Sequence, residues 1–122
     1  MRLNEIQFGQ GRPVDGYGPG FFRVGGAVVQ GGVLLLPDVG ATMWRGFEDL
    51  DPILAAADRI DVLFVGTGAQ TAHLPAAMRQ ALEQAGIGAE PMASPAACRT
   101  YNILLSEGRR VGLAALPVPD AL

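Results

Sequence analysis

Two segments in the second half of the chain carry residue types that could bind a small anion. Gly66-Thr67-Gly68 follows an apolar run of strand length, and Arg99 and Asn102 lie in the opening turns of a helix expected to begin at Ser94. Glycines let a ligand approach backbone N–H groups closely, and the positive end of a helix attracts anions. If both segments meet at the carboxyl edge of a parallel sheet, Arg99 could act as the counter-ion of a bound ligand.

Each of these residues also has a purely structural interpretation. A Gly-Thr-Gly turn can simply join a strand to a helix, and the chain has no GxGxxG or GxxxxGK[ST] fingerprint of a nucleotide site. Arg99 is disfavoured by the helix dipole at this position, so it needs either an acidic partner, such as Asp61 or Glu90, or a ligand. Asn102 can equally be a satisfied polar residue at the edge of the core.

Groups suited to covalent or acid–base catalysis are few. Cys98 is the only cysteine and His73 the only histidine. A thiol near a helix N-terminus has a lowered pKa, and a loop imidazole beside the site could transfer protons. A packed cysteine and an exposed loop histidine are the alternative interpretations. With no lysine, no complete catalytic set and no metal-ligand or cofactor pattern, the sequence favours a non-enzymatic protein without metal or cofactor.

Two aromatic residues are candidates for a protein interface. Tyr17 stands at the centre of a glycine-framed loop, and Trp44 ends a short apolar run. Large rings with one polar atom contribute most of the binding energy at many interfaces. The alternative is that these rings pack the first part of the chain onto the rest of the core.

The elements that must position these residues alternate between strand and helix in residues 49–117. Asp51-Pro52 and Ser94-Pro95 are each typical of a helix cap followed by a proline at the first helical position. Pro75 is typical of a helix start, and Gly108 of a helix end. Helix-length crossovers favour parallel strands with right-handed connections. The expected β-α-β-α-β part has strands at 61–65, 88–92 and 110–116, with helices between them.

Residues 1–48 have a different pattern, which predicts an antiparallel β meander. Its β-type runs are separated by glycine pairs or by Pro37-Asp38, and they lie at 21–24, 27–30, 33–36 and 39–44. We expect an α/β fold of three layers with a central mixed, largely parallel sheet, which the meander either joins or covers on one face. With no linker or repeat, residues 1–122 are expected to form a single domain that ends in a tail at 118–122.

The overall composition excludes several classes of protein. The formal charge is −3 and the nine arginines are scattered, which argues against nucleic-acid binding. Apolar runs are only of strand length, far below the roughly 18 residues of a membrane span. The first residues, Met1 to Glu5, have no apolar region typical of a signal peptide, so we expect a cytoplasmic protein without a membrane span.

Several of these motifs together resemble those of a known family. They are Gly16-Tyr17-Gly18, Phe21 with Arg23, Leu34-Leu35-Leu36-Pro37, Trp44, Gly66-Thr67-Gly68, Ala97-Cys98-Arg99-Thr100-Tyr101-Asn102 and Gly108-Arg109-Arg110. The chain resembles, from about residue 4 to residue 117, small α/β domains of unknown function in bacteria and archaea. Their mitochondrial member is assembly factor 3 of NADH:ubiquinone oxidoreductase, which is respiratory complex I.

This resemblance implies a three-layer α/β fold with a mixed sheet and an additional β layer. It implies no catalytic activity. It suggests a non-enzymatic interaction module that assists assembly of a membrane respiratory complex, with subunits of that complex as partners. The alternative is a small-ligand or anion-binding domain, or an enzyme, centred on Gly66, Thr67, Gly68, Arg99 and Asn102.

Overall fold

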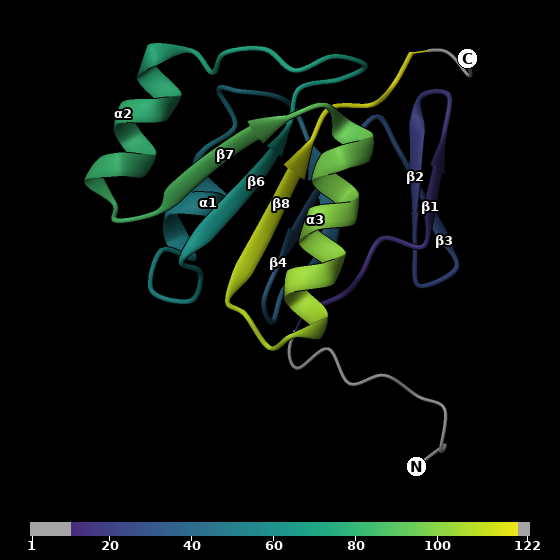
Figure 1. Cartoon of the computed structure of the whole chain (residues 1–122), viewed down its shortest axis with the longest axis horizontal. Coiled ribbons are helices and arrows are strands. Elements are labelled where there is room, and N and C mark those ends of the chain that lie inside the picture. Colours follow the sequence, from purple (N-terminus) through teal and green to yellow (C-terminus); the bar gives the residue numbers. More distant parts are fainter. Residues whose placement is uncertain (1–10, 120–122) are drawn as a thin grey trace.

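A computed structural model describes residues 11–119, and within this range the chain folds into three helices and eight strands (Figure 1). Residues 1–10 of the expected meander and residues 120–122 of the expected tail lie outside the described range. In chain order the elements are β1 (Gly16–Gly18), β2 (Phe21–Val24), β3 (Ala27–Gln30), β4 (Gly32–Leu36), β5 (Gly40–Trp44), α1 (Asp51–Ala55), β6 (Val62–Gly66), α2 (Ala76–Gln84), β7 (Gly88–Met92), α3 (Ser94–Ser106) and β8 (Val111–Ala115).

The central sheet has five strands in the order β5-β4-β8-β6-β7. β6 pairs in parallel with β7 and β8, as expected from the β-α-β-α-β pattern. β4 pairs antiparallel with β5 and β8, so two of the four pairings are parallel. β4 and β8 are buried along their whole length, which explains why each is a continuous apolar run. The predicted mixed sheet is confirmed.

The expected meander is divided between two sheets. β1, β2 and β3 form an antiparallel sheet of their own, whereas β4 and β5 belong to the central sheet. Gly25 and Gly26 make the β2–β3 turn with φ of 59° and 82°, which glycine adopts without steric cost. The segment 16–18, interpreted as a loop from its glycines, is strand β1 and pairs with β2. The two expected roles of the meander, joining the sheet and covering it, are therefore both realised.

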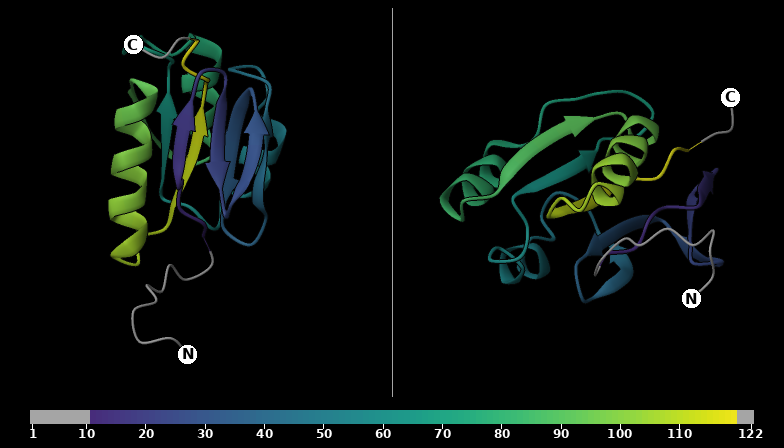
Figure 2. Two further views of the ribbon diagram at one scale, coloured as in Figure 1. Left: turned by 90° about the vertical axis from the view of Figure 1, so that its right-hand side faces the viewer. Right: turned by 60° about the horizontal axis from the view of Figure 1, so that its bottom comes forward.

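The fold has three layers because both faces of the central sheet are covered by other elements (Figure 2). Successive residues of β4 contribute to opposite faces: Val33 and Leu35 to one hydrophobic cluster, Leu34 and Leu36 to the other. The first cluster is covered by α3 and the β1–β3 sheet, and the second by α1 and α2. The α/β fold of three layers expected from the sequence is thus confirmed.

At Gly32 the backbones of both strands that border β4 lie close to the space a side chain would need. A Cβ at this position would overlap the carbonyl oxygen of Trp44 and lie 3.1 Å from that of Ala115. Neither carbonyl can move without disturbing the sheet, because each belongs to a strand that borders β4. A glycine is therefore required here for close packing.

The substitution Gly32→Ala is expected to lower the free energy of unfolding by about 1–3 kcal/mol, the usual cost of overpacking a core. Gly16→Ala is the matched control, since a Cβ at Gly16 meets nothing within 4 Å and its φ is not in the left-handed region. Urea unfolding followed by circular dichroism measures both variants. Equal stabilities would contradict the packing constraint at Gly32.

Candidate functional site

The Gly66–Gly68 turn lies where expected, at the carboxyl end of β6, but the start of α3 is bound to it. The hydroxyl of Ser94 accepts a hydrogen bond from the Gly68 N–H at 2.9 Å and donates one to the Leu116 carbonyl oxygen at 2.6 Å. The Ser94 N–H also donates to the Gly68 carbonyl at 2.8 Å. Ser94 is fully buried and joins β6, α3 and the segment after β8.

Ser94 was expected to cap α3, and this expectation is wrong. The cap position is Ala93, and no side chain caps the helix. The hydroxyl of Ser94 instead makes the contacts between strands described above. Asp51 likewise is the first residue of α1, whose cap position is Leu50.

The side chain of Thr67 is used within its own loop. Its hydroxyl donates to the Gln70 carbonyl oxygen at 2.6 Å and accepts from the Ala72 N–H at 3.1 Å. A Cβ at Gly66 would lie 2.6 Å from the Ser94 hydroxyl, so the glycine permits contact with α3. These contacts favour the structural interpretation of the Gly-Thr-Gly turn over a ligand cradle.

The structure does not bring Asn102 to this turn. Asn102 lies eight residues after Ser94 in α3, or about 12 Å along the helix. Its side-chain amide accepts from the Val14 N–H and donates to the Val14 carbonyl oxygen, both at 2.8 Å. It thus pairs with the backbone as a neighbouring strand would. Asn102 is occupied by the chain itself.

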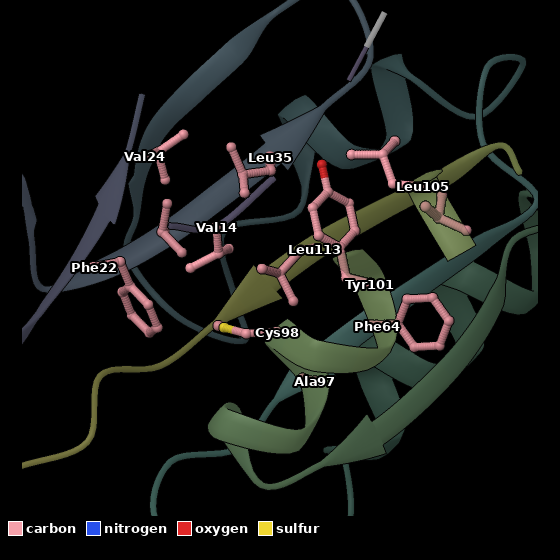
Figure 3. Close-up of a cluster of buried hydrophobic side chains, with 13 residues drawn as sticks. Val14, Phe22, Val24, Leu35, Phe64, Ala97, Cys98, Tyr101, Leu105 and Leu113 are labelled. Atoms are coloured by element: carbon pink, nitrogen blue, oxygen red, sulfur yellow. The ribbon is translucent and has the colours of Figure 1, made fainter. Parts of the chain in front are cut away.

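Tyr101 holds the same N-terminal segment, which we call the strap (residues 11–15). Its hydroxyl donates to the Arg12 carbonyl oxygen at 2.7 Å, while its ring is fully buried in the cluster beneath α3 (Figure 3). Val14 is buried in the same cluster. Tyr101 and Asn102 therefore fix the strap against α3.

Arg99 is exposed on α3, and among residues 11–119 its guanidinium forms no ion pair. Of the two acidic partners expected for it, Asp61 pairs instead with Arg110 at 3.3 Å. Glu90 is exposed, and neither described ion pair includes it. Arg99 therefore lies on the surface, away from the hydrogen bonds of the Ser94 contact.

The remaining candidates for chemistry are separated from one another. Cys98 is buried, and desolvation raises its pKa from 9.0 to about 12, an effect that the nearby Arg99 charge only partly offsets. Its thiol is consequently protonated near neutral pH and unsuited to nucleophilic attack. His73 is exposed in the loop before α2. Within the described residues, no group of three or more His, Cys, Asp or Glu side chains could hold a metal ion.

The two interface candidates differ in exposure. Tyr17 is 48% exposed on β1 and remains available to a partner. Trp44 is only 2% exposed, so the expectation that it anchors an interface is corrected: it is a core residue. Its ring packs edge-on against Phe47, and its indole N–H donates to the Asp49 carbonyl oxygen at 3.1 Å. Burial of an indole requires such a partner, which the turn after β5 supplies.

Two surface grooves that the sequence did not indicate lie on the α1 and α2 side. The first, which we call the Phe47 groove, has a volume of about 560 Å³ and lies between the segment after β5 and the start of α2. The second, which we call the β5 groove, has a volume of about 510 Å³ and runs between β5 and α1. Arg45 lines both grooves. The one feature of the sequence that could have indicated a groove here is the pair Phe47 and Leu50, which are separated by two acidic residues and are half-buried in the structure.

The sequence pattern of one family, described as a protein of unknown function (DUF498/DUF598), matches residues 14–116. The chain belongs to this family. An uncharacterized protein of Rhodobacter capsulatus is 50% identical over all 122 residues and 98% of its own length. The human NADH dehydrogenase [ubiquinone] 1 alpha subcomplex assembly factor 3 is 34% identical over 98% of this chain and 68% of its own length.

Solved structures support the same family fold. A crystal structure of an outer membrane protein from Bartonella henselae matches with a TM-score of 0.81 and 34% identity, covering 88% of this chain and 95% of that one. The solution structure of a Bordetella pertussis protein with an Mth938-like domain matches with a TM-score of 0.75 and 27% identity, over 100% and 96% of the two chains. In this family member, none of the helices within residues 11–119 is long and apolar enough to span a membrane.

Asn102→Ala is expected to lower the free energy of unfolding by about 1–3 kcal/mol, because the Val14 N–H and carbonyl lose their partners. Arg99→Ala, on the exposed side of the same helix, is the control and should change stability by less than about 0.5 kcal/mol. Chemical unfolding measures both. If only Arg99→Ala lost stability, the structural role assigned to Asn102 and the surface role assigned to Arg99 would both be wrong.

Stability is expected to fall as the pH rises above 9. Burial raises the pKa of Cys98 from 9.0 to about 12 and also raises the pKa of Tyr101 above its ordinary value of 10.0. Above pH 9 the unfolded chain therefore holds fewer protons than the folded chain, so raising the pH favours unfolding. Urea unfolding between pH 8 and pH 11 should give a slope approaching about 1.4 kcal/mol per pH unit for each group. Cys98→Ala should flatten the slope between pH 9 and pH 10, and an unchanged slope would contradict this assignment.

Proposed function

We propose that this protein is a non-enzymatic, cytoplasmic interaction module that assists assembly of a membrane respiratory complex by binding one of its subunits. The observation that carries the proposal is the relation to assembly factor 3, which extends over 98% of this chain at 34% identity. Because the similarity extends over nearly the whole chain, it covers surface residues as well as core residues. The uncharacterized relative from Rhodobacter capsulatus is consistent with a bacterial setting.

The contacts at the carboxyl edge of the sheet support a role other than small-molecule chemistry. At this edge, the Gly68 N–H and the Thr67 hydroxyl both bond to groups of the chain itself. Displacing the buried Gly68–Ser94 hydrogen bond would leave a buried polar group without a partner, at a cost of about 1–3 kcal/mol. A ligand at this edge would have to compensate for that cost.

We place the partner site at the Phe47 groove. Phe47, Leu50 and Met78 line it with apolar surface, and Arg45 and Glu48 add one charge of each sign. An apolar centre with a charged rim is the usual composition of a protein interface. The groove is open rather than enclosed, which suits a side chain or short segment of a protein partner.

Ala77→Glu tests this site, because Ala77 is exposed in the first turn of α2 and lines the groove. The neighbouring Ala76→Glu is the matched control: Ala76 is also an exposed alanine of α2, but it does not line the groove. Tagged variants are expressed in the native host, crosslinked and purified, and co-purifying proteins are quantified by mass spectrometry. Wild type and Ala76→Glu should enrich a respiratory-complex subunit, and Ala77→Glu should reduce that enrichment about tenfold or more, since a desolvated charge costs over 1.4 kcal/mol.

Two outcomes would contradict the proposal in different ways. If the wild type enriches no respiratory subunit, even after crosslinking, the assembly role is wrong. If all three proteins enrich the same subunit equally, the assembly role stands and the Phe47 groove is not the binding site.

A further inference from the structure

The two edges of the central sheet are protected to different degrees. At one edge, β7 carries Glu90 and Pro91, and a charge or a proline is a usual means of preventing an edge strand from pairing with another chain. At the other edge, β5 has the sequence Gly-Ala-Thr-Met-Trp and carries neither a charge nor a proline. β5 is therefore the edge open to a further strand.

The exposure of β5 agrees with an unpaired edge. Ala41, Thr42 and Met43 are all exposed, and Met43 reaches 63%, the highest value among the exposed large hydrophobic residues of the described chain. Val39, directly before the strand, is 50% exposed. β3 lies near β5 but belongs to the other sheet, so within the described chain β4 is the only hydrogen-bonded neighbour of β5.

We propose that β5 pairs with β5 of a second copy of this chain, antiparallel and about a two-fold axis, to form a continuous ten-stranded sheet. An axis perpendicular to the sheet keeps each face on its own side, so that directly opposed residues come from the same face. Ala41 and Met43 share the face of their β4 partners, Leu35 and Val33. Met43 of one copy therefore lies opposite a small or apolar residue of the other copy.

The residue of β5 through which the two-fold axis passes decides which residue of the other copy lies opposite Met43. If the axis passes Thr42, the centre of β5, Met43 lies opposite Ala41 of the other copy and the two Thr42 hydroxyls adjoin. If the axis passes Ala41, Met43 lies beside Val39, an exposed apolar residue of the turn that precedes β5. Both arrangements remove the exposed Met43 side chain from water, which stabilises the pair.

The charges at the ends of the strand favour a second copy over an unrelated strand. Asp38 lies before β5 and Arg45 directly after it, and both are exposed. Asp38 belongs to the turn before β5, and in an antiparallel pair this turn adjoins the end of β5 of the other copy, and so its Arg45. The two-fold axis repeats this contact, so that the antiparallel pair has an opposite charge pair at both ends.

A pair of five-residue strands buries less surface than the roughly 1,200 Å² or more of stable interfaces. The dimer is therefore a weak, reversible one, which forms and separates with protein concentration. In sedimentation velocity, wild-type protein should shift from monomer toward dimer over roughly a hundredfold rise in concentration. A wild-type chain that stays monomeric over that range overturns the proposal.

Met43→Lys should abolish the shift, because it places a charge at the centre of the paired edge. Ile103→Lys is the matched control: Ile103 is a similarly exposed apolar residue, at 57%, but lies on α3. It should dimerise as the wild type does. Thermal unfolding of both variants checks that the fold is retained. Dimerisation that survives Met43→Lys, or is lost only in Ile103→Lys, places the contact elsewhere and overturns the proposal.

Asp38 and Arg45, the charged residues at the two ends of β5, allow a test whose expected result could not arise from a loss of folding. Arg45→Glu should weaken the dimer about tenfold or more, since it places Glu beside Asp38 of the other copy. Asp38→Asn, a change that the left-handed φ of 67° tolerates, should weaken it less and should relieve part of the loss in the double variant. Within one chain these residues lie at opposite ends of β5, whose five residues span about 16 Å at 3.3 Å per residue, too far to couple directly. Strictly additive effects would argue against the antiparallel pair.

A crosslink identifies the register. Cys98 is the single native cysteine and is buried, so the background reaction is low. Thr42→Cys should form a disulfide-linked dimer under mild oxidation by oxidised glutathione if the axis passes Thr42, and Ala41→Cys if it passes Ala41. If neither crosslinks while Ile103→Cys does, β5 is not the contact.

Discussion

The hydroxyl of Ser94 makes the contact on which the arrangement of the central sheet and α3 depends. It accepts from the Gly68 N–H and donates to the Leu116 carbonyl, so one buried oxygen joins the turn after β6, the start of α3 and the segment after β8. Space for it exists because residue 66 is a glycine. The Ser94 side chain is fully buried, where an unpaired polar group would be costly. The sheet edge where α/β proteins commonly bind ligands is therefore used here to position α3.

Once α3 is placed in this way, its next turns hold the strap. Tyr101 and Asn102 bond to the backbone at Arg12 and Val14, and Cys98 packs in the same cluster. The Ala97–Asn102 motif, one of those that carry the family resemblance, thus has a structural explanation in three of its residues. A polar motif can be specific because it must satisfy backbone groups of a segment far away in sequence. Specificity of a motif is therefore not by itself a sign of catalysis.

The sequence predicted the elements well and their contacts poorly. β2, β3 and β7 have the predicted bounds, because alternating or continuous apolar runs and glycine turns are local signals. β1 was missed because three residues framed by glycine have almost no strand pattern, and only pairing with β2 stabilises them. The sequence also could not predict that β3 and β4 belong to different sheets. A glycine turn can join two strands of one sheet or two strands of different sheets.

The contacts of the candidate site residues were not predictable for a related reason. Residue types indicated what Gly68 and Asn102 could bind, but Gly68 bonds to Ser94, 26 positions away, and Asn102 bonds to Val14, 88 positions away. Trp44 was judged from its size and polar atom, which fit an interface anchor and a buried ring equally well. Its burial depends on the Asp49 carbonyl and the Phe47 ring, which local pattern does not predict.

Buried Trp44 nevertheless shapes the surface that we assign to partners. Its indole N–H and the Arg45 N–H both donate to Asp49, through the carbonyl and the carboxylate, at 3.1 Å each. These bonds fold the segment after β5 back on itself, between the end of β5 and the Phe47 groove. The Arg45 side chain consequently lines both grooves. A contact that engages Arg45 at β5 removes it from the rim of the Phe47 groove, and by linkage the two contacts weaken each other. Under these two proposals, self-pairing of β5 and partner binding at the Phe47 groove therefore compete for Arg45.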